Sequence, residues 1–145
     1  MTNFGNLEEQ LDPFDVYFTY KGKQYGFSPS VEDVLAFQID LNRSRTDGTT
    51  EMDVWNRVIA LSGGKMSKTG KISGGVLEEL TGDGVPFSVI DRFVQAVHLK
   101  YANNNDIAKA YFETGELGKA LEKLKSDAQR NQATQTDAGE TNGGA

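Results

Sequence analysis

The chain has 145 residues with 15 Lys plus Arg, 21 Asp plus Glu, no Cys and a formal charge of −6. This length accommodates one domain with a hydrophobic core, and the acidic charge argues against a protein that mainly grips nucleic-acid phosphates. Without cysteine there is no disulfide and no zinc–thiolate site. No apolar run approaches the roughly 20 residues that cross a bilayer, and the first six residues lack the features of a secretory signal. We therefore expect a soluble, single-domain intracellular protein that binds neither nucleic acid nor membrane.

A β-hairpin is predicted over residues 16–27, where two aromatic-rich arms flank Lys21-Gly-Lys23. Gly22 can adopt the positive φ that a tight hairpin turn requires. Alternation places five large side chains on one face, namely Val16, Phe18, Tyr20, Tyr25 and Phe27. An isolated hairpin is marginal in water, so this face is expected to dock on helices.

Helical patterns follow the hairpin. Capping-box spacings at Ser30-Val-Glu-Asp33 and Thr50-Glu-Met-Asp53 predict two helix starts, and Pro86 suits the first position of a long helix that Asn103–Asn105 ends. A short helix through 110–112 and a last helix complete the pattern. The side chains expected to face the core are Val31, Val34, Leu35 and Leu41; Val54, Trp55, Val58, Ile59 and Leu61; Val76, Leu77 and Leu80; and Phe87, Ile90, Val94, Val97 and Tyr101, with Phe93 and His98 at the margin.

Two segments are predicted to be irregular. Residues 62–75 contain five glycines and three lysines and no acid, which indicates a flexible, locally basic loop. After Leu124 the only aliphatic side chains are alanines, so residues 126–145 are expected to form a disordered tail whose first turn or two can continue the last helix. The predicted fold is mainly α: a small helical domain over residues 1–125 with an N-terminal hairpin, followed by the tail.

The motifs that carry chemistry in other proteins are incomplete here. Lys65-Met-Ser-Lys-Thr69 nearly spells the lysine signature of class I aminoacyl-tRNA synthetases, but the chain has no run of alternating strands and helices to support it. The same loop misses the P-loop spacing, because five residues separate Gly64 from Gly70. His98 is the chain's one histidine and lacks partners at metal-ligand spacing. We therefore expect no catalytic, cofactor-binding or metal-binding residues, and no enzyme.

Two stretches share a pattern with a known family. The first runs from Asn6-Leu-Glu-Glu-Gln-Leu-Asp-Pro13 through Lys21-Gly-Lys-Gln-Tyr25 to Val31-Glu-Asp-Val-Leu35. The second runs from Val76-Leu-Glu-Glu-Leu-Thr-Gly-Asp-Gly-Val-Pro-Phe87 to Ala108-Lys-Ala-Tyr-Phe112. Together they cover about two thirds of the chain, and they resemble the tail assembly chaperones of long-tailed, siphovirus-type actinobacteriophages. The basic loop at 63–75 and the segment Asn103-Asn-Asn-Asp106 depart from the family's pattern.

The resemblance implies a non-catalytic chaperone, present in the host cytoplasm and absent from the mature virion. Its partner would be the tape measure protein, a long helical chain that the chaperone keeps soluble during assembly of the tail tube. The tail tube protein and a longer, frameshifted form of the chaperone itself are further implied partners, and homo-oligomerisation is left open.

The expected mode of binding is helix-in-groove, through apolar side chains that a small helical domain leaves uncovered. The candidate partner-binding residues are Leu117, Leu121 and Leu124 on the last helix. The alternative, that these leucines simply close the core, stays open. The competing functional hypothesis is a small structural tail or head-tail adaptor protein. A nucleic-acid binder acting through Lys65–Lys71, and an enzyme built around His98, rank below it.

Overall fold

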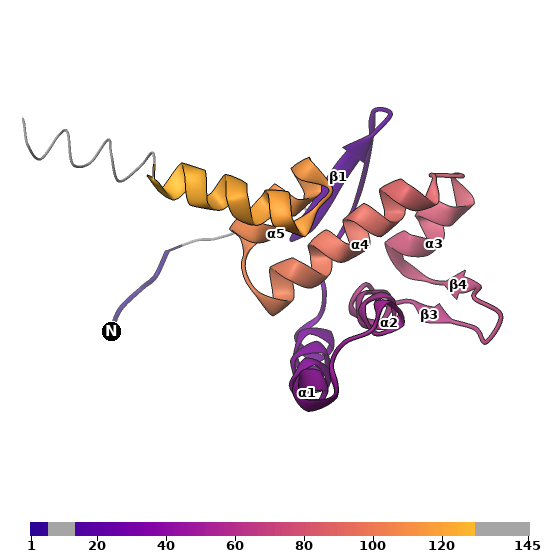
Figure 1. Ribbon diagram of the computed structural model, residues 1–145. Helices are drawn as coiled ribbons and strands as arrows, with labels where there is room; N and C mark the ends of the chain where they lie inside the picture. Colours follow the sequence, from indigo (N-terminus) through magenta and orange to yellow (C-terminus); the bar gives the residue numbers. More distant parts are fainter. Residues whose placement is uncertain (6–13, 130–145) are drawn as a thin grey trace, which may run out of the picture. The chain divides into compact units, whose positions relative to one another are not determined.

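A computed structural model describes residues 1–5 and 14–129 of the chain, with the backbone alone at 45–47. The chain divides into two compact units, Met1–Val94 and Gln95–Ala145, a division that no feature of the sequence indicated. The predicted mainly α fold with an N-terminal hairpin is confirmed (Figure 1). The opening motif at 6–13 and residues 130–145 of the predicted tail lie outside the described residues.

The predicted hairpin is present. Strands β1 (Val16–Tyr20) and β2 (Lys23–Phe27) pair antiparallel, with Phe18 opposite Tyr25. Lys21 has φ 50° and Gly22 has φ 82°, and positive φ at both central residues is the requirement of a type I′ turn, whose twist matches that of the strands.

An aromatic cluster docks the hairpin on a helix, as expected. The ring of Phe18 lies 5.7 Å from that of Tyr25 and 4.7 Å from that of Phe93, and Phe27 meets Phe93 edge-on at 6.4 Å. All four side chains are buried. The rest of this unit's innermost core is aliphatic and comprises Val58, Leu61, Leu77, Leu80 and Val94.

Helices α1 (Val31–Asp47) and α2 (Glu51–Leu61) begin at the predicted caps. The Ser30 hydroxyl accepts the Asp33 amide at 3.1 Å, and Thr50 and Asp53 form a reciprocal capping box. The predicted core residues of α2 are buried, apart from a half-buried Trp55.

The predicted inward face of α1 is wrong at two positions. Val31 is 72% exposed and Leu35 is 57% exposed, whereas Val34 and Leu41 are half-buried and Phe37, which the pattern did not single out, is buried. The reason lies in the packing of α1 against α2, which uses polar side chains and is described below.

The predicted flexible loop at 62–75 is instead a short hairpin. Strands β3 (Lys65–Met66) and β4 (Ile72–Ser73) pair antiparallel, with Met66 opposite Ile72. Inside the turn the Ser67 amide donates to the Lys71 carbonyl at 2.8 Å. Gly70, with φ 92°, supplies a backbone conformation that other residues rarely adopt. Gly70 therefore serves a defined turn, and the loop prediction is corrected.

Helix α3 (Gly75–Gly82) buries Val76, Leu77 and Leu80 as predicted. Pro86 lies just before α4 (Phe87–Ala102), one position earlier than predicted, and its carbonyl accepts the Ile90 amide at 3.1 Å.

The apolar stripe predicted for α4 is largely confirmed. The side chains of Ile90, Phe93, Val94 and Val97 are buried, and those of His98 and Tyr101 are half-buried. Phe87 is the exception, because its side chain is 70% exposed. The predicted stripe therefore begins at Ile90 and leaves Phe87 on the surface.

The second unit holds the end of α4, then α5 (Asn105–Thr114) and a helix over residues 117–129. The predicted break at Asn103–Asn105 is confirmed, and Asn104 caps α5 by accepting the Ile107 amide at 3.0 Å. Gly115 ends α5 in the left-handed conformation. Residues 126–129 continue the last helix, as the expected first turn of the tail allows. No helix in the described part of the chain has the length and apolarity to span a membrane.

Candidate protein-binding site

The three leucines predicted to bind a partner differ in exposure. Leu117 is 46% exposed and Leu121 is 51% exposed, whereas Leu124 is half-buried and Ala120 on the same helix is fully buried. Leu124 lines a hollow of about 420 Å³ with Ala110. The helix therefore buries its Ala120 face and leaves Leu117 and Leu121, one turn apart, in contact with solvent.

Charged side chains surround that hollow. Glu113 of α5 and Lys123 of the last helix form an ion pair across it, and Lys123 lowers the pKa of the Glu113 carboxyl. The ion pair connects α5 to the last helix beside Leu124.

A second exposed apolar stripe runs along α1 and was missed. Val31, Leu35 and Ile39 follow each other at four-residue spacing and are 72%, 57% and 56% exposed. On a helix these positions share one face, which lies roughly opposite Phe37. The four-residue spacing was visible in the sequence, but the pattern alone does not say whether such a face points to the core or to solvent.

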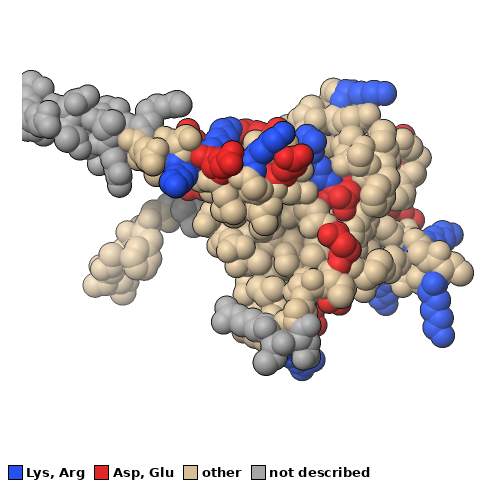
Figure 2. All heavy atoms as spheres, viewed as in Figure 1, with Lys and Arg blue, Asp and Glu red and all other residues tan. Residues whose placement is uncertain are grey.

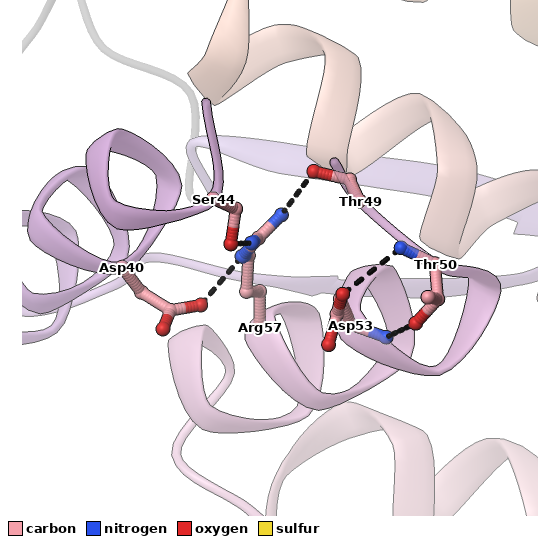
Figure 3. Close-up of polar contacts among 6 residues, drawn as sticks. All are labelled: Asp40, Ser44, Thr49, Thr50, Asp53 and Arg57. Atoms are coloured by element: carbon pink, nitrogen blue, oxygen red, sulfur yellow. Dashed lines mark hydrogen bonds and ion pairs between the residues drawn. The ribbon is translucent and has the colours of Figure 1, made fainter. Parts of the chain in front are cut away.

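The buried guanidinium of Arg57 explains why α1 faces this way. Arg57 is 5% exposed, and its Nε donates to Asp40 Oδ2 at 2.6 Å while its Nη1 donates to Thr49 Oγ1 at 3.3 Å (Figure 3). Its Nη2 donates to the Ser44 hydroxyl. Asp40 and Ser44 are one turn apart on the side of α1 that carries Phe37. This contact turns the polar side of α1 toward α2 and leaves the apolar stripe outside.

An open, mainly apolar groove lies in the first unit between α2, the start of α4 and the β3–β4 hairpin; we call it the Trp55 groove. It has a volume of about 850 Å³, and its apolar lining consists of Met52, Trp55, Met66, Ile72, Val85, Phe87 and Ile90. Trp55 and Phe87 stack with ring centroids 5.6 Å apart and planes 5° from parallel. Met52 is 54% exposed. The groove therefore presents aromatic and methionine surface directly to solvent.

A hydrogen bond fixes the orientation of the indole in the groove. Trp55 Nε1 donates to Asp91 Oδ1 at 3.0 Å, so the polar edge of the ring is satisfied within the protein. Stacking on the ring of Phe87 further restricts the orientation of the indole. A preformed aromatic surface of this kind loses little side-chain entropy when a partner covers it.

Charged side chains of both signs lie in and beside the Trp55 groove. Glu51 of α2 and Asp91 of α4 line the groove itself. The β3–β4 hairpin beside it bears Lys65, Lys68 and Lys71, all exposed, of which Lys71 lines a smaller adjoining hollow, and Figure 2 shows basic side chains projecting where this hairpin lies in Figure 1. The sequence showed the lysines but not the apolar groove beside them, because its walls come from four separate segments.

A polar cluster fixes the N-terminal hairpin on α3. Lys23 Nζ lies 2.7 Å from Asp83 Oδ2 and 3.0 Å from Glu79 Oε1, and the Tyr25 hydroxyl donates to Asp83 Oδ2 at 2.7 Å. The hydrogen bonds from Lys23 and Tyr25 lower the pKa of the Asp83 carboxyl, and the contacts of Lys23 with Asp83 and Glu79 raise the pKa of its ammonium. These contacts hold the hairpin on α3, and their residues are not among the large exposed apolar side chains.

The near-match to the synthetase signature and the chain's one histidine lie in different units. Lys65-Met-Ser-Lys-Thr69 forms β3 and the turn after it, and His98 is half-buried in the second unit. Among the residues described, no group of three or more His, Cys, Asp or Glu side chains is arranged to hold a metal ion.

One family model matches nearly the whole chain. It is described as "Domain of unknown function (DUF7426)" and covers residues 5–144. The chain belongs to the DUF7426 family. No curated protein and no solved structure matches it. The matched range includes both compact units, so the Trp55 groove, the α1 stripe and the exposed leucines all lie within the DUF7426 domain.

Proposed function

We propose that this DUF7426 protein is a phage tail assembly chaperone that binds the tape measure protein and keeps it soluble while the tail tube assembles. The observation that carries the proposal is the exposure of large apolar side chains at helical spacing, first of all Val31, Leu35 and Ile39 on α1. The resemblance of residues 6–35 and 76–112 to such chaperones supplies the identity of the client.

The physical basis is the removal of apolar surface from water. An aliphatic side chain transferred from water to an apolar contact contributes about 1.5–3 kcal/mol when it is fully buried, and contiguous exposed apolar patches on soluble proteins mark interaction sites. A helical client with apolar stripes offers a matching surface. Leu117, Leu121 and Leu124 remain the proposed contacts of the second unit, with Leu117 and Leu121 the more accessible.

Co-expression tests this function. The chain is produced together with the tape measure protein of the same phage, and the soluble fraction of the client is compared with that of cells that produce the client alone. We expect the client to move into the soluble fraction and to co-purify with the tagged chain. Unchanged client solubility without co-purification would contradict the proposal.

Mass spectrometry of purified virions separates the chaperone from an adaptor that stays in the particle. The proposal places the chain in the host cytoplasm and predicts its absence from the virion. Detection at a stoichiometry comparable to that of known tail proteins would instead favour a structural tail or head-tail component.

The coding DNA offers an independent observation on the longer form. A chaperone of this kind is expected to have a slippery heptamer near the 3′ end of its reading frame, an overlapping downstream frame and then a very long gene. The absence of all three would remove the support that the resemblance lends to the proposal.

A further inference from the structure

We infer that the Trp55 groove binds an amphipathic helix of a partner polypeptide, and that the flank of this helix facing the β3–β4 hairpin is acidic. The inference rests on the proposed function in taking the occupant to be another polypeptide, but it specifies the groove and the charge pattern of the bound segment.

The openness of the groove favours a helix over a small ligand. Small-molecule sites enclose most of the ligand's surface and contain a few convergent polar groups. Here Phe87 is 70% exposed and Met52 is 54% exposed, so the walls cover only one side of an occupant. The carboxylate of Asp91 already accepts from the Trp55 indole. An occupant therefore contributes one apolar face and leaves its other faces in water, as an amphipathic helix does.

The composition of the lining suits a helical partner. Stacked Trp55 and Phe87 give a rigid aromatic surface, and tryptophan is among the residues that dominate the energy of protein interfaces. Met52 and Met66 lie beside it, and their flexible thioether side chains adapt to irregular apolar shapes. The groove can thus receive apolar residues spaced at i, i+3, i+4 and i+7.

The lysines of the hairpin beside the groove determine which flank of the occupant faces the hairpin. Residues 62–75 contain three lysines and no acid, and no ion pair involving Lys65, Lys68 or Lys71 is found within residues 1–5 and 14–129. A smaller hollow lined by Lys71 and Glu78 shares Gly70, Ile72 and Thr81 with the groove, so the groove continues along the hairpin. Carboxylates on the partner's hairpin-facing flank pair with these lysines, whereas a basic flank is repelled.

The test uses the full chain and three designed helical peptides of about 18 residues, five turns each. The first has a leucine stripe and a glutamate flank, the second replaces the glutamates with lysines, and the third replaces the leucines with alanines. None contains tryptophan, so the emission of Trp55, the chain's one tryptophan, reports on the groove. We expect a saturable blue shift with the first peptide, binding about tenfold or more weaker with the second, and no shift with the third.

Variants assign the binding to the groove. The double variant Lys68→Glu/Lys71→Glu is expected to reverse the preference between the glutamate and lysine peptides without altering the aromatic surface. Phe87→Ala, at an exposed position, is expected to weaken binding of the glutamate peptide about tenfold or more, measured with a fluorophore on the peptide. Tyr17→Ala on β1, an exposed aromatic position that does not line the groove, is the control, with unchanged affinity. Equal binding of both charged peptides, or no binding, would overturn the inference.

Two further outcomes separate this inference from the proposed function. If the tape measure protein co-purifies as well with the Phe87→Ala and the Lys68→Glu/Lys71→Glu variants as with the wild type, the groove does not bind the client. The chaperone function would then still stand. If the glutamate peptide binds as expected and the tape measure protein does not bind, the groove inference stands and the proposed client is wrong. A concentration-dependent shift of Trp55 emission in the peptide-free chain would assign the groove to a second copy and overturn the inference.

Discussion

Helices α1 and α2 begin with the same kind of cap, but α2 buries its aliphatic side chains whereas α1 exposes several of its own. Each has a hydroxyl cap and acids in its first turn. In α2 the aliphatic residues Val58 and Ile59 are 0% and 2% exposed, whereas in α1 Leu35 and Ile39 are 57% and 56% exposed. The contrast shows that capping signals determine where a helix starts, while the face it buries depends on the partner that packs against it.

The difference between the two helices has a polar cause. Arg57 is taken out of water on α2, and a buried guanidinium requires acceptors, which Asp40 and Ser44 of α1 supply. Once α1 presents these side chains to α2, its apolar stripe faces away. We interpret the stripe as surface that the fold keeps available for another polypeptide.

Ile59 on α2 is buried and Ile39 on α1 is exposed, so the two positions form a matched pair for alanine substitution. The largest expected loss of stability is at Ile59. Ile59→Ala on α2 removes a side chain that is 2% exposed, so we expect a loss of about 2–5 kcal/mol in the free energy of unfolding. Urea denaturation followed by circular dichroism measures this loss. A change as small as that of an exposed residue would show that the α2 face is not the core of the first unit.

The next effect concerns the contact that orients α1. Arg57→Ala leaves Asp40, Ser44 and Thr49 without the donor they share, and we expect a loss of about 1–3 kcal/mol in the free energy of unfolding. Arg43→Ala, at an exposed position of the same helix pair, is the control and should lie within about 0.5 kcal/mol of the wild type. Equal effects of the two substitutions would refute the anchoring role of Arg57.

A smaller effect is expected in the pH dependence of the hairpin cluster. Because Lys23 and Tyr25 hold the pKa of Asp83 below its ordinary value of 3.8, the Asp83 carboxylate stabilises the fold above that pH, and the contribution is lost as the pH falls through the lowered pKa. On the alkaline side, the raised pKa of Lys23 keeps its contribution intact until the pH exceeds the ordinary value of 10.5.

Urea denaturation of the wild type and of Asp83→Asn at a series of pH values measures this contribution. The difference in unfolding free energy between the two proteins should be constant near neutral pH and should close below about pH 3.8. A difference that persists at low pH would contradict the assignment to the carboxylate.

The smallest expected effect is that of the same substitution at the exposed isoleucine of the pair. Ile39→Ala on α1 removes a side chain that is 56% exposed, and we expect the free energy of unfolding to change by no more than about 0.5 kcal/mol. The same denaturation experiment checks it against Ile59→Ala. A loss of several kcal/mol would show that the α1 stripe is covered in the folded protein.

The sequence predicted the local features of the fold and missed those that depend on distant segments. The hairpin turn at Gly22, the caps at Ser30 and Thr50 and the break at Asn103–Asn105 all follow from short-range chemistry, and all are present. The outward face of α1 could not be predicted, because it depends on Arg57, which looks like an ordinary surface residue in the sequence.

The candidate sites show the same limit. Leu117 and Leu121 are candidates because a terminal helix has few core neighbours; both are exposed, and their role in partner binding stays a prediction. The sequence does not reveal the Trp55 groove, because the pattern places Trp55 and Phe87 in the core and predicts an irregular segment at 62–75. A groove whose walls come from separate segments has no signature in any one of them.

The most direct test of the central claim is a comparison of client binding by two versions of the chain. The first is the wild type, and the second carries serine at exposed apolar positions of both units, namely Leu35, Ile39, Phe87, Leu117 and Leu121. If exposed apolar surface binds the tape measure protein, the variant should co-purify with less client than the wild type, by a factor of about ten or more. Its stability should remain that of the wild type. Equal amounts of client on both versions would contradict the account.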